Sequence, residues 1–303
     1  MKTESESISV TKVTSVICFT RIVLASGLLA TLLFALVILS GCGTFQMAQL
    51  PPVASDPDAK LNVRKFVWID LLTEDTGAAS VFYEALFGWH AAPSRRDESY
   101  YVFSLDDNPV AGMSAVDNKD AKVPESWWLL SLSVDDVDQS LAVVEEHGGK
   151  LLEGPVDDAG RGRMALVSDP GGAPLILLRA AGGDPADEKA AVGEWFWTDL
   201  FTRDAKAAEA FYKPLAGFQK TQLEAGEDHR YLVFKQNGKP RSGVVELRWD
   251  DLEDNWMPYV MVDDIKSTID TARELGGNLI LEKGDVAILV DPSGAVFGIQ
   301  AKR

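Results

Sequence analysis

The chain has 303 residues, a formal net charge of −17 and two cysteines, Cys18 and Cys42. An acidic surface repels phosphate backbones and anionic headgroups, so nucleic acid is not an expected partner. With no cysteine beyond residue 42, the rest of the chain has no disulfide scaffold, no thiolate nucleophile and no cysteine metal site.

The amino terminus predicts a secretory signal. A basic stretch over residues 1–21 precedes an uncharged apolar run, 22–41, which is the layout of such signals. The run ends in Leu39-Ser40-Gly41-Cys42, which resembles the lipobox of bacterial lipoproteins, where a peptidase cuts before a diacylglycerol-bearing cysteine. The alternative is an uncleaved helix, because twenty apolar residues are long enough to cross a bilayer. Either way, the remaining chain lies outside the cytoplasm.

These features divide the chain into four parts. We expect a signal peptide over 1–41, the lipidated Cys42 with a proline-containing tether to residue 60, and two modules over 61–181 and 182–303. In a Gram-negative cell, Gly43 rather than Asp after the cysteine resembles proteins sorted to the outer membrane. The expected location is the cell envelope, on the periplasmic face of that membrane.

The two modules are copies of one unit. The segment 66–89 recurs as 195–218, 129 positions later, with the same Trp, Asp, Ala-Ala, Phe-Tyr and Gly pattern. In the first copy a strand is predicted over 66–72, followed by a helix that Asp75 caps and Gly88 ends. Its apolar residues fall at helical spacing, and among them Phe82 and Tyr83 are expected in the core.

Further strands are predicted over 100–105 and 110–116, and then a second strand–helix unit begins. It consists of a strand over 128–134, a helix over 137–147 that ends at Gly148-Gly149, and strands at 164–167 and 175–178.

The second copy repeats this order. Phe211 and Tyr212 take the places of Phe82 and Tyr83, and the later elements are expected at 259–262, 265–275, 287–290 and 296–300. Each copy is therefore two βαβββ-like halves, which makes four in the chain.

These motifs resemble the vicinal oxygen chelate superfamily, which includes glyoxalase I, extradiol dioxygenases and bleomycin resistance proteins. The resemblance covers residues 64–303. It rests on the capping Asp and closing Gly of the first helix, on Val-Asp-Asp with Gly-Gly around the second, and on the Asp-Pro turns at 169–173 and 291–295. It implies an α+β fold of two tandem modules, each of paired βαβββ units curling around a concave cleft.

In metal-dependent members of this family, three positions in a module supply a histidine, a second ligand and a glutamate. The corresponding residues here are Trp68, Leu129 and Ile176 in the first module and Trp197, Met257 and Gly298 in the second. None of these side chains holds a divalent metal, which needs imidazole, thiolate or carboxylate oxygen. We therefore expect no metal and no cofactor, and the family's metal-dependent chemistry is not expected either. The three histidines, His90, His147 and His229, are not expected to replace the missing ligands.

Two pairs recur where the family places its clefts: Trp68 with Asp70, and Trp197 with Asp199. Residues two apart on a strand share a face, so in each pair an indole and a carboxylate look the same way. Such a pair could hold a cationic or hydroxylated ligand. The alternative is that each Trp fills a collapsed cleft and each Asp caps a backbone amide.

The same alternation adds further ligand-binding candidates. Ser131 shares its strand face with Leu129, Tyr259 shares its face with Met257, and Arg163 could oppose Asp70 or meet an anionic ligand.

The preferred hypothesis is a membrane-anchored, metal-free protein that binds a small molecule or an envelope protein and catalyses nothing. The alternative from another class is a lyase, isomerase or glyoxalase-like enzyme with Asp70 or Asp199 as general base. A scaffold with filled clefts and a homodimer both stay open.

Overall fold

The computed structural model describes residues 50–54, 56, 58–116, 126–225, 229–247 and 253–302. The expected signal peptide, its apolar run and Cys42 lie outside these residues. Within them, no helix combines the length and the apolar character needed to cross a membrane.

The first module forms one eight-stranded sheet with two helices, in the order β2-β3-β4-β1-β5-β8-β7-β6. Strand β1 pairs antiparallel with β5 at the centre, while β1–β4 and β5–β8 are parallel. The bounds are β1 (Phe66–Thr73), α4 (Thr76–Phe87), β2 (His90–Pro93), β3 (Tyr100–Leu105), β4 (Asn108–Ala115), β5 (Trp127–Ser133), α5 (Val137–Glu146), β6 (Lys150–Asp158), β7 (Gly162–Ser168) and β8 (Pro174–Ala180).

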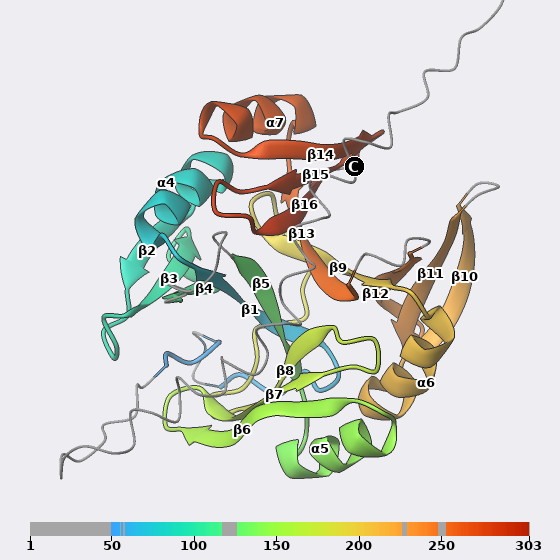
Figure 1. Ribbon diagram of the computed structural model, residues 1–303. Helices are drawn as coiled ribbons and strands as arrows, with labels where there is room; N and C mark the ends of the chain where they lie inside the picture. The colour runs from blue at the N-terminus through green and yellow to red at the C-terminus, as the bar shows by residue number, and fades with distance from the viewer. Residues whose placement is uncertain are drawn as a thin grey trace, which may run out of the picture.

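The second module repeats the same sheet order with β10-β11-β12-β9-β13-β16-β15-β14. The four predicted βαβββ halves are therefore confirmed, and Figure 1 shows each half as one block of the colour ramp. The bounds are β9 (Trp195–Thr202), α6 (Ala205–Ala216), β10 (Gln219–Ala225), β11 (His229–Gln236), β12 (Lys239–Glu246), β13 (Asn255–Val262), α7 (Ile265–Glu274), β14 (Asn278–Lys283), β15 (Val286–Val290) and β16 (Val296–Ala301).

The predicted helix signals act as expected. An aspartate carboxylate accepts a backbone N–H in the first turn of each of the four described helices; for example, Asp75 Oδ1 accepts from Ala78 N at 2.8 Å. Gly88 and Gly217 end α4 and α6 with φ of 71° and 63°, a left-handed conformation that glycine adopts without a Cβ clash. The short hairpin strand β2 was not predicted.

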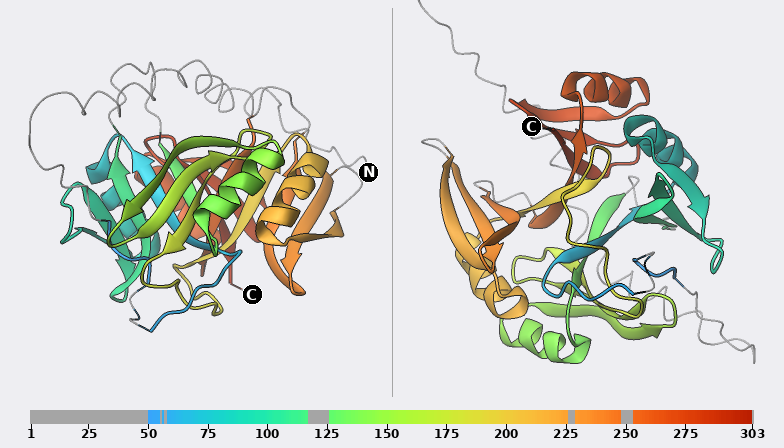
Figure 2. Two further views of the ribbon diagram at one scale, coloured as in Figure 1. Left: turned by 90° about the horizontal axis from the view of Figure 1, so that it is seen from below. Right: turned by 180° about the vertical axis from the view of Figure 1, so that it is seen from behind.

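Helices of the two modules pack against each other in pairs. Helix α4 of the first module lies against α7 of the second, and α5 lies against α6, as Figure 1 and the right view of Figure 2 show. The core is shared: the rings of Trp128 and Trp195, from different modules, lie 4.8 Å apart between centroids. Phe82 and Phe211, expected in the core, are both buried there.

The second glycine of each Gly-Gly pair makes room for this packing. A Cβ on Gly149 would lie 2.7 Å from Cε2 of Phe211, and one on Gly277 would lie 2.8 Å from Cε2 of Phe82. Both distances are shorter than van der Waals contact, so the aromatic ring of one module sits directly on the backbone of the other.

Candidate functional site

Trp68 and Asp70 lie on the face of the first sheet that is turned away from the helices. Between them on β1, Ile69 points to the opposite face and joins the core. Register places Trp68 beside Ser131 on β5 and Ser131 beside Ile176 on β8. The expected shared orientation of Trp68 and Asp70 is therefore present, and Ser131 is buried next to them.

These two residues form a closed hydrogen-bonded group with Tyr100 from β3. The indole Nε1 of Trp68 donates to Asp70 Oδ1 at 3.0 Å and to Tyr100 Oη at 3.1 Å, and the Tyr100 hydroxyl donates to Asp70 Oδ1 at 2.5 Å. Gly112 on β4 makes this approach possible, since a Cβ there would lie 1.7 Å from the Tyr100 oxygen.

A buried arginine completes this first cluster, which we define as Trp68, Asp70, Tyr100 and Arg161. Arg161 Nη2 donates to Tyr100 Oη at 2.7 Å, and Nη1 lies 3.5 Å from Asp70 Oδ2. The guanidinium carbon stands 5.1 Å from the ring centre of Trp68 and 5.4 Å from that of Tyr100. The Asp70 charge is thus balanced by a cation held over two aromatic rings.

The expectation that Arg163 could oppose Asp70 is wrong. Arg163 lies on the outside of β7, where Nη2 pairs with Asp138 at 2.8 Å and Nη1 pairs with Asp157 at 2.7 Å. Gly162 has φ of +116°, so the backbone turns between the two arginines and strand alternation does not extend back to Arg161. In the sequence, the Gly-Arg-Gly-Arg run at 160–163 is the signal that could have indicated this backbone turn.

The segment ahead of β1 covers the first cluster. Arg161 Nε donates to the carbonyl of Pro51 at 2.8 Å, and Leu50 N donates to Asp158 Oδ2 at 3.0 Å. Val53 is 1% exposed and packs in a small apolar cluster with Trp68. The described residues from 50 onward, within the stretch expected as a tether, therefore lie against the first module, as the blue trace near β7 and β8 in Figure 1 indicates.

The second module repeats the indole, carboxylate and phenol. Trp197 Nε1 donates to Asp199 Oδ1 at 2.8 Å and to Tyr231 Oη at 2.9 Å, and the Tyr231 hydroxyl donates to Asp199 Oδ1 at 2.7 Å. Gly243 again leaves the space, because its Cβ would lie 2.0 Å from the Asp199 oxygen. Sequence reasoning missed both Tyr100 and Tyr231.

Tyr259 is the fourth member of this second cluster, which we define as Trp197, Asp199, Tyr231 and Tyr259. It lies beside Trp197 on one side and Gly298 on the other, and its hydroxyl lowers the pKa of the Asp199 carboxyl. A Cβ on Gly298 would lie 2.0 Å from Cδ1 of Tyr259, so the glycine is needed for the ring to fit. Tyr259 occupies the register position that Ser131 has in the first module.

The two clusters differ in charge and in exposure. Burial raises the pKa of the Asp199 carboxyl, and the groups that lower it are three neutral donors, from Tyr231, Tyr259 and Trp197. Trp68 and Tyr100 are buried, whereas Trp197 and Tyr231 are both partly exposed. The second cluster is therefore the one in which solvent reaches two aromatic rings, those of Trp197 and Tyr231, while Tyr259 is buried.

The donor set does not fit the metal that the family fold implies. The six ligand positions hold indole, aliphatic, thioether and glycine groups, and no cluster of three or more His, Cys, Asp or Glu side chains occurs among the described residues. His90 is exposed near Glu84, and His147 Nδ1 lies 2.9 Å from the carbonyl of Val143 at the end of α5. The side chain of His229 lies outside the described part of the chain.

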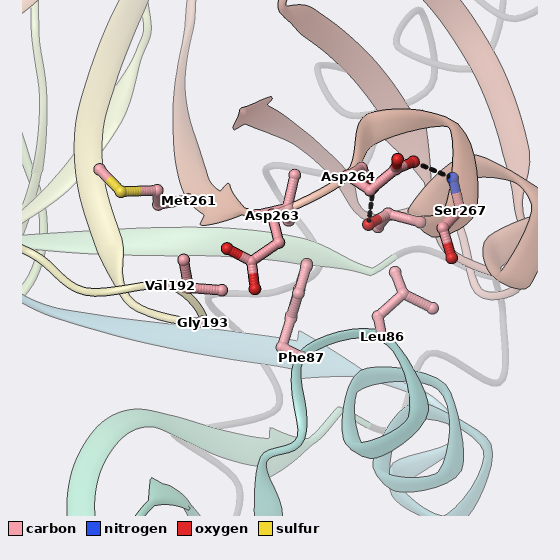
Figure 3. A pocket seen from close by; sticks show the side chains of 10 residues that line it. Leu86, Phe87, Val192, Gly193, Met261, Asp263, Asp264 and Ser267 are labelled. Atoms are coloured by element: carbon pink, nitrogen blue, oxygen red, sulfur yellow. Dashed lines mark hydrogen bonds between the residues drawn. The ribbon is translucent and has the colours of Figure 1, made fainter. Parts of the chain in front are cut away.

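A separate pocket of about 220 Å³ lies between the modules, at the end of α4 and the start of α7. Figure 3 shows Phe87 and Met261 on its walls, with Asp263 pointing toward them. Asp264 at its rim accepts from Ser267 N at 2.7 Å and so caps α7. Neither the first nor the second cluster lines this pocket.

Comparison with known proteins identifies the class. Residues 65–177 match the family model described as the Glyoxalase/Bleomycin resistance protein/Dioxygenase superfamily. A Mycobacterium tuberculosis (strain CDC 1551 / Oshkosh) protein named "Putative glyoxylase CFP32" is 30% identical over 255 residues, which cover 77% of this chain and 92% of that protein. The "Anthracycline biosynthesis protein DnrV" of Streptomyces peucetius is 30% identical over 253 residues, covering 77% and 91%. The chain belongs to the glyoxalase/bleomycin resistance/dioxygenase superfamily.

Solved structures support the same fold. The Mn(II)-bound glyoxalase from Novosphingobium aromaticivorans aligns with a TM-score of 0.55 and 16% identity, over 79% of this chain and 82% of that one. The 2,3-dioxygenase LapB from Pseudomonas sp. KL28 aligns with a TM-score of 0.55 and 12% identity, over 80% and 94%. At these identities the likeness concerns architecture.

Proposed function

We propose that the chain is a lipid-anchored protein of the cell envelope that binds a small organic molecule at the second cluster, without metal-dependent catalysis. One observation carries this proposal: a buried carboxylate, Asp199, is joined by hydrogen bonds to aromatic side chains that solvent reaches. Small-molecule sites combine mostly apolar walls with a few fixed polar groups in this way.

We do not propose that the first cluster binds a ligand. Arg161 already balances Asp70, and residues 50–53 lie over it, so its polar groups are satisfied within the chain. We therefore expect one ligand per chain, bound in the second module.

A second candidate function is catalysis with Asp199 as general base. Burial raises the pKa of its carboxyl, and a base works best when its pKa approaches the operating pH. The relatives named as a glyoxylase and as anthracycline biosynthesis proteins favour an enzyme, although their names concern those proteins. Asp70 is less suited, because Arg161 pairs with it and residues 50–53 cover it.

The binding proposal is tested by ligand screening on the full chain in detergent. A mixed set of cationic, neutral and anionic small molecules is followed by tryptophan fluorescence and thermal shift. We expect at least one saturable ligand whose affinity falls at least tenfold in Trp197→Phe and is unchanged in Val81→Ala, which alters an exposed helix position. Loss of turnover in Asp199→Asn with retained ligand binding would instead support the enzyme.

Metal content is a separate test. Elemental analysis of the chain, purified without a tag and dialysed against manganese, iron, nickel and zinc, should find no stoichiometric metal. One metal per chain would contradict our assignment of the six ligand positions and move the protein to the metalloenzymes.

The lipid anchor is tested at Cys42. Labelled palmitate should enter the wild-type chain and be absent from Cys42→Ala. A mature mass that still includes residues 1–41 would favour the membrane-spanning alternative. Only eight positions separate Cys42 from Leu50, so an anchored first module would stand at most about 28 Å from the lipid, at about 3.5 Å per extended residue.

A further inference from the structure

Arg161 shows which chemical group this arrangement of side chains accepts. Its guanidinium lies over the rings of Trp68 and Tyr100, at 5.1 and 5.4 Å, and faces the carboxylate of Asp70. The side chain of Arg161 is only 2% exposed. A buried cation is stable only with matched partners, and here an anion, a phenol oxygen and a backbone carbonyl supply them.

The second module has the same carboxylate and rings without this cation. Strand register makes Val286 the counterpart of Met164, and Lys283, which pairs with Val286, the counterpart of Val156 on β6. The β14–β15 hairpin is shorter than the β6–β7 hairpin and contains no arginine, so it supplies no equivalent of Arg161. Lys283 is exposed at the end of β14. Among the described side chains, the groups that act on the Asp199 carboxylate besides burial are the neutral Tyr231, Tyr259 and Trp197, and none of them is a cation.

The surroundings of Asp199 provide a surface for a cation from solution. Trp197 and Tyr231 are the counterparts of the two rings beneath Arg161, and here both are partly exposed. Tyr259 adds a third ring on the same row of the sheet. The partly exposed rings of Trp197 and Tyr231 beside the carboxylate attract a cation through the ring quadrupoles, and the carboxylate adds direct charge.

From this internal comparison we propose that the ligand of the second cluster is an organic cation, of the guanidinium or alkylammonium class. Its charged group takes the place that Arg161 occupies in the first cluster. This inference rests on the proposed function and names the ligand class for the same site.

The hydrogen bonds of Arg161 further favour a planar guanidinium. Three separate nitrogens, Nε, Nη1 and Nη2, face three different acceptors in the first cluster. A guanidinium presents donors in this fork, whereas a quaternary ammonium has no N–H to donate. We expect methylguanidinium to bind at least fivefold more tightly than tetramethylammonium.

The test compares methylguanidinium with methylurea, a neutral molecule of nearly the same shape. Full-length protein in detergent, labelled with ¹⁵N at the tryptophan indoles, is titrated with each, and Trp197→Phe assigns the Trp197 signal. Methylguanidinium should shift the Trp197 indole saturably while the buried Trp68 indole stays in place. Methylurea should produce no saturable shift.

Substitutions test whether the Asp199 carboxylate is the partner of the bound cation. Asp199→Asn should weaken methylguanidinium binding at least tenfold, whereas Asp270→Asn, which removes the same charge from a half-exposed position on α7, should change it less than twofold. Tyr259→Phe is a second, milder variant, and we expect it to lower the affinity for methylguanidinium two- to fivefold. Thermal melting verifies that each variant is folded.

The outcomes separate this inference from the proposed function. Saturable binding of neutral or anionic molecules at Trp197, with none by methylguanidinium, would overturn the cation assignment and leave the binding function standing. Equal cation affinity in Asp199→Asn and wild type would also overturn it. If no ligand of any class bound in either experiment, both the cation assignment and the proposed binding function would be contradicted.

Discussion

The hydroxyl of Tyr83 on α4 donates a hydrogen bond to Asp291 of the other module, with 3.1 Å between Oη and Oδ2. The reverse contact is also present: Tyr212 donates to Asp169 at 3.1 Å. Each tyrosine in turn accepts from an indole, Trp128 for Tyr83 and Trp256 for Tyr212. The Phe-Tyr and Asp-Pro motifs that repeat along the sequence thus meet across the interface, which explains why each module carries both.

Removing one of these hydroxyls tests the interface. Tyr83→Phe leaves a buried carboxylate oxygen and the Trp128 N–H each short of a partner, so we expect a loss of about 1–3 kcal/mol in the free energy of unfolding. Tyr212→Phe should lose a similar amount. Urea unfolding measures both, with Tyr101→Phe, partly exposed on β3, as the control. A loss no larger than the control's would mean that the cross-module bond contributes little.

The glycines beneath the aromatic rings provide a steric test. Gly149→Ala brings a methyl within 2.7 Å of Phe211 and 2.6 Å of the Ser168 carbonyl, so the modules must shift apart. The expected cost is about 1–3 kcal/mol, the range for overpacked cores. Gly77→Ala, in the first turn of α4 with its nearest contact at 3.3 Å, is the matched control and should not destabilise. Thermal unfolding of the two variants should therefore shift in clearly different amounts.

The fold followed from the sequence because its signals are local and occur twice. Asp75 and Gly88 bound a helix by themselves, and their repetition fixes the module. The members of the two clusters were harder to predict. Trp68 and Asp70 share a strand, but Tyr100 reaches them only through the order β3-β4-β1, which depends on pairing across the sheet. A signal was present, since Tyr100 and Gly112 recur together as Tyr231 and Gly243, each 131 positions later.

Other parts of the candidate site could not be predicted from strand periodicity. The left-handed turn at Gly162 decides that Arg161 is buried and Arg163 is outside. The segment from Leu50 has no apolar repeat, yet one valine, Val53, and the Pro51 carbonyl suffice to place it on the first cluster. Because only one side chain and one backbone group make these contacts, they produce no periodic sequence pattern from which the position of the segment could be predicted.

Asp169 should make stability depend on pH. Burial, together with the nearby charge of Asp254, raises the pKa of its carboxyl to about 6, against the opposing effect of hydrogen bonds from Ala173 N, Tyr212 and Gly171 N. Between about pH 4 and pH 6 the folded chain holds a proton that the unfolded chain has released, so the free energy of unfolding falls as pH rises through this window. The fall is about 3 kcal/mol at most, from about 1.4 kcal/mol for each pKa unit.

Urea unfolding at several pH values measures this effect. The difference between wild type and Asp169→Asn should change across pH 4 to 6 and be constant above it. Asp106→Asn, on an exposed turn, is the control variant. A constant difference between wild type and Asp169→Asn over the whole range would show that Asp169 has an ordinary pKa in the folded chain.

Substitution of the two arginines of the Gly-Arg-Gly-Arg run should change stability by very different amounts. Arg161→Ala removes the only cation that pairs with Asp70 among the described contacts, and with it the partner of the Pro51 carbonyl. An uncompensated buried charge costs about 3–5 kcal/mol, so we expect a loss of that order in the free energy of unfolding and easier proteolysis near residue 50. Arg163→Ala breaks ion pairs on the surface, where screening by water makes them weak, and should hardly change either measurement. Equal losses in the two variants would contradict the assignment of Arg161 as the internal cation, and with it the comparison from which the ligand class of the second cluster was inferred.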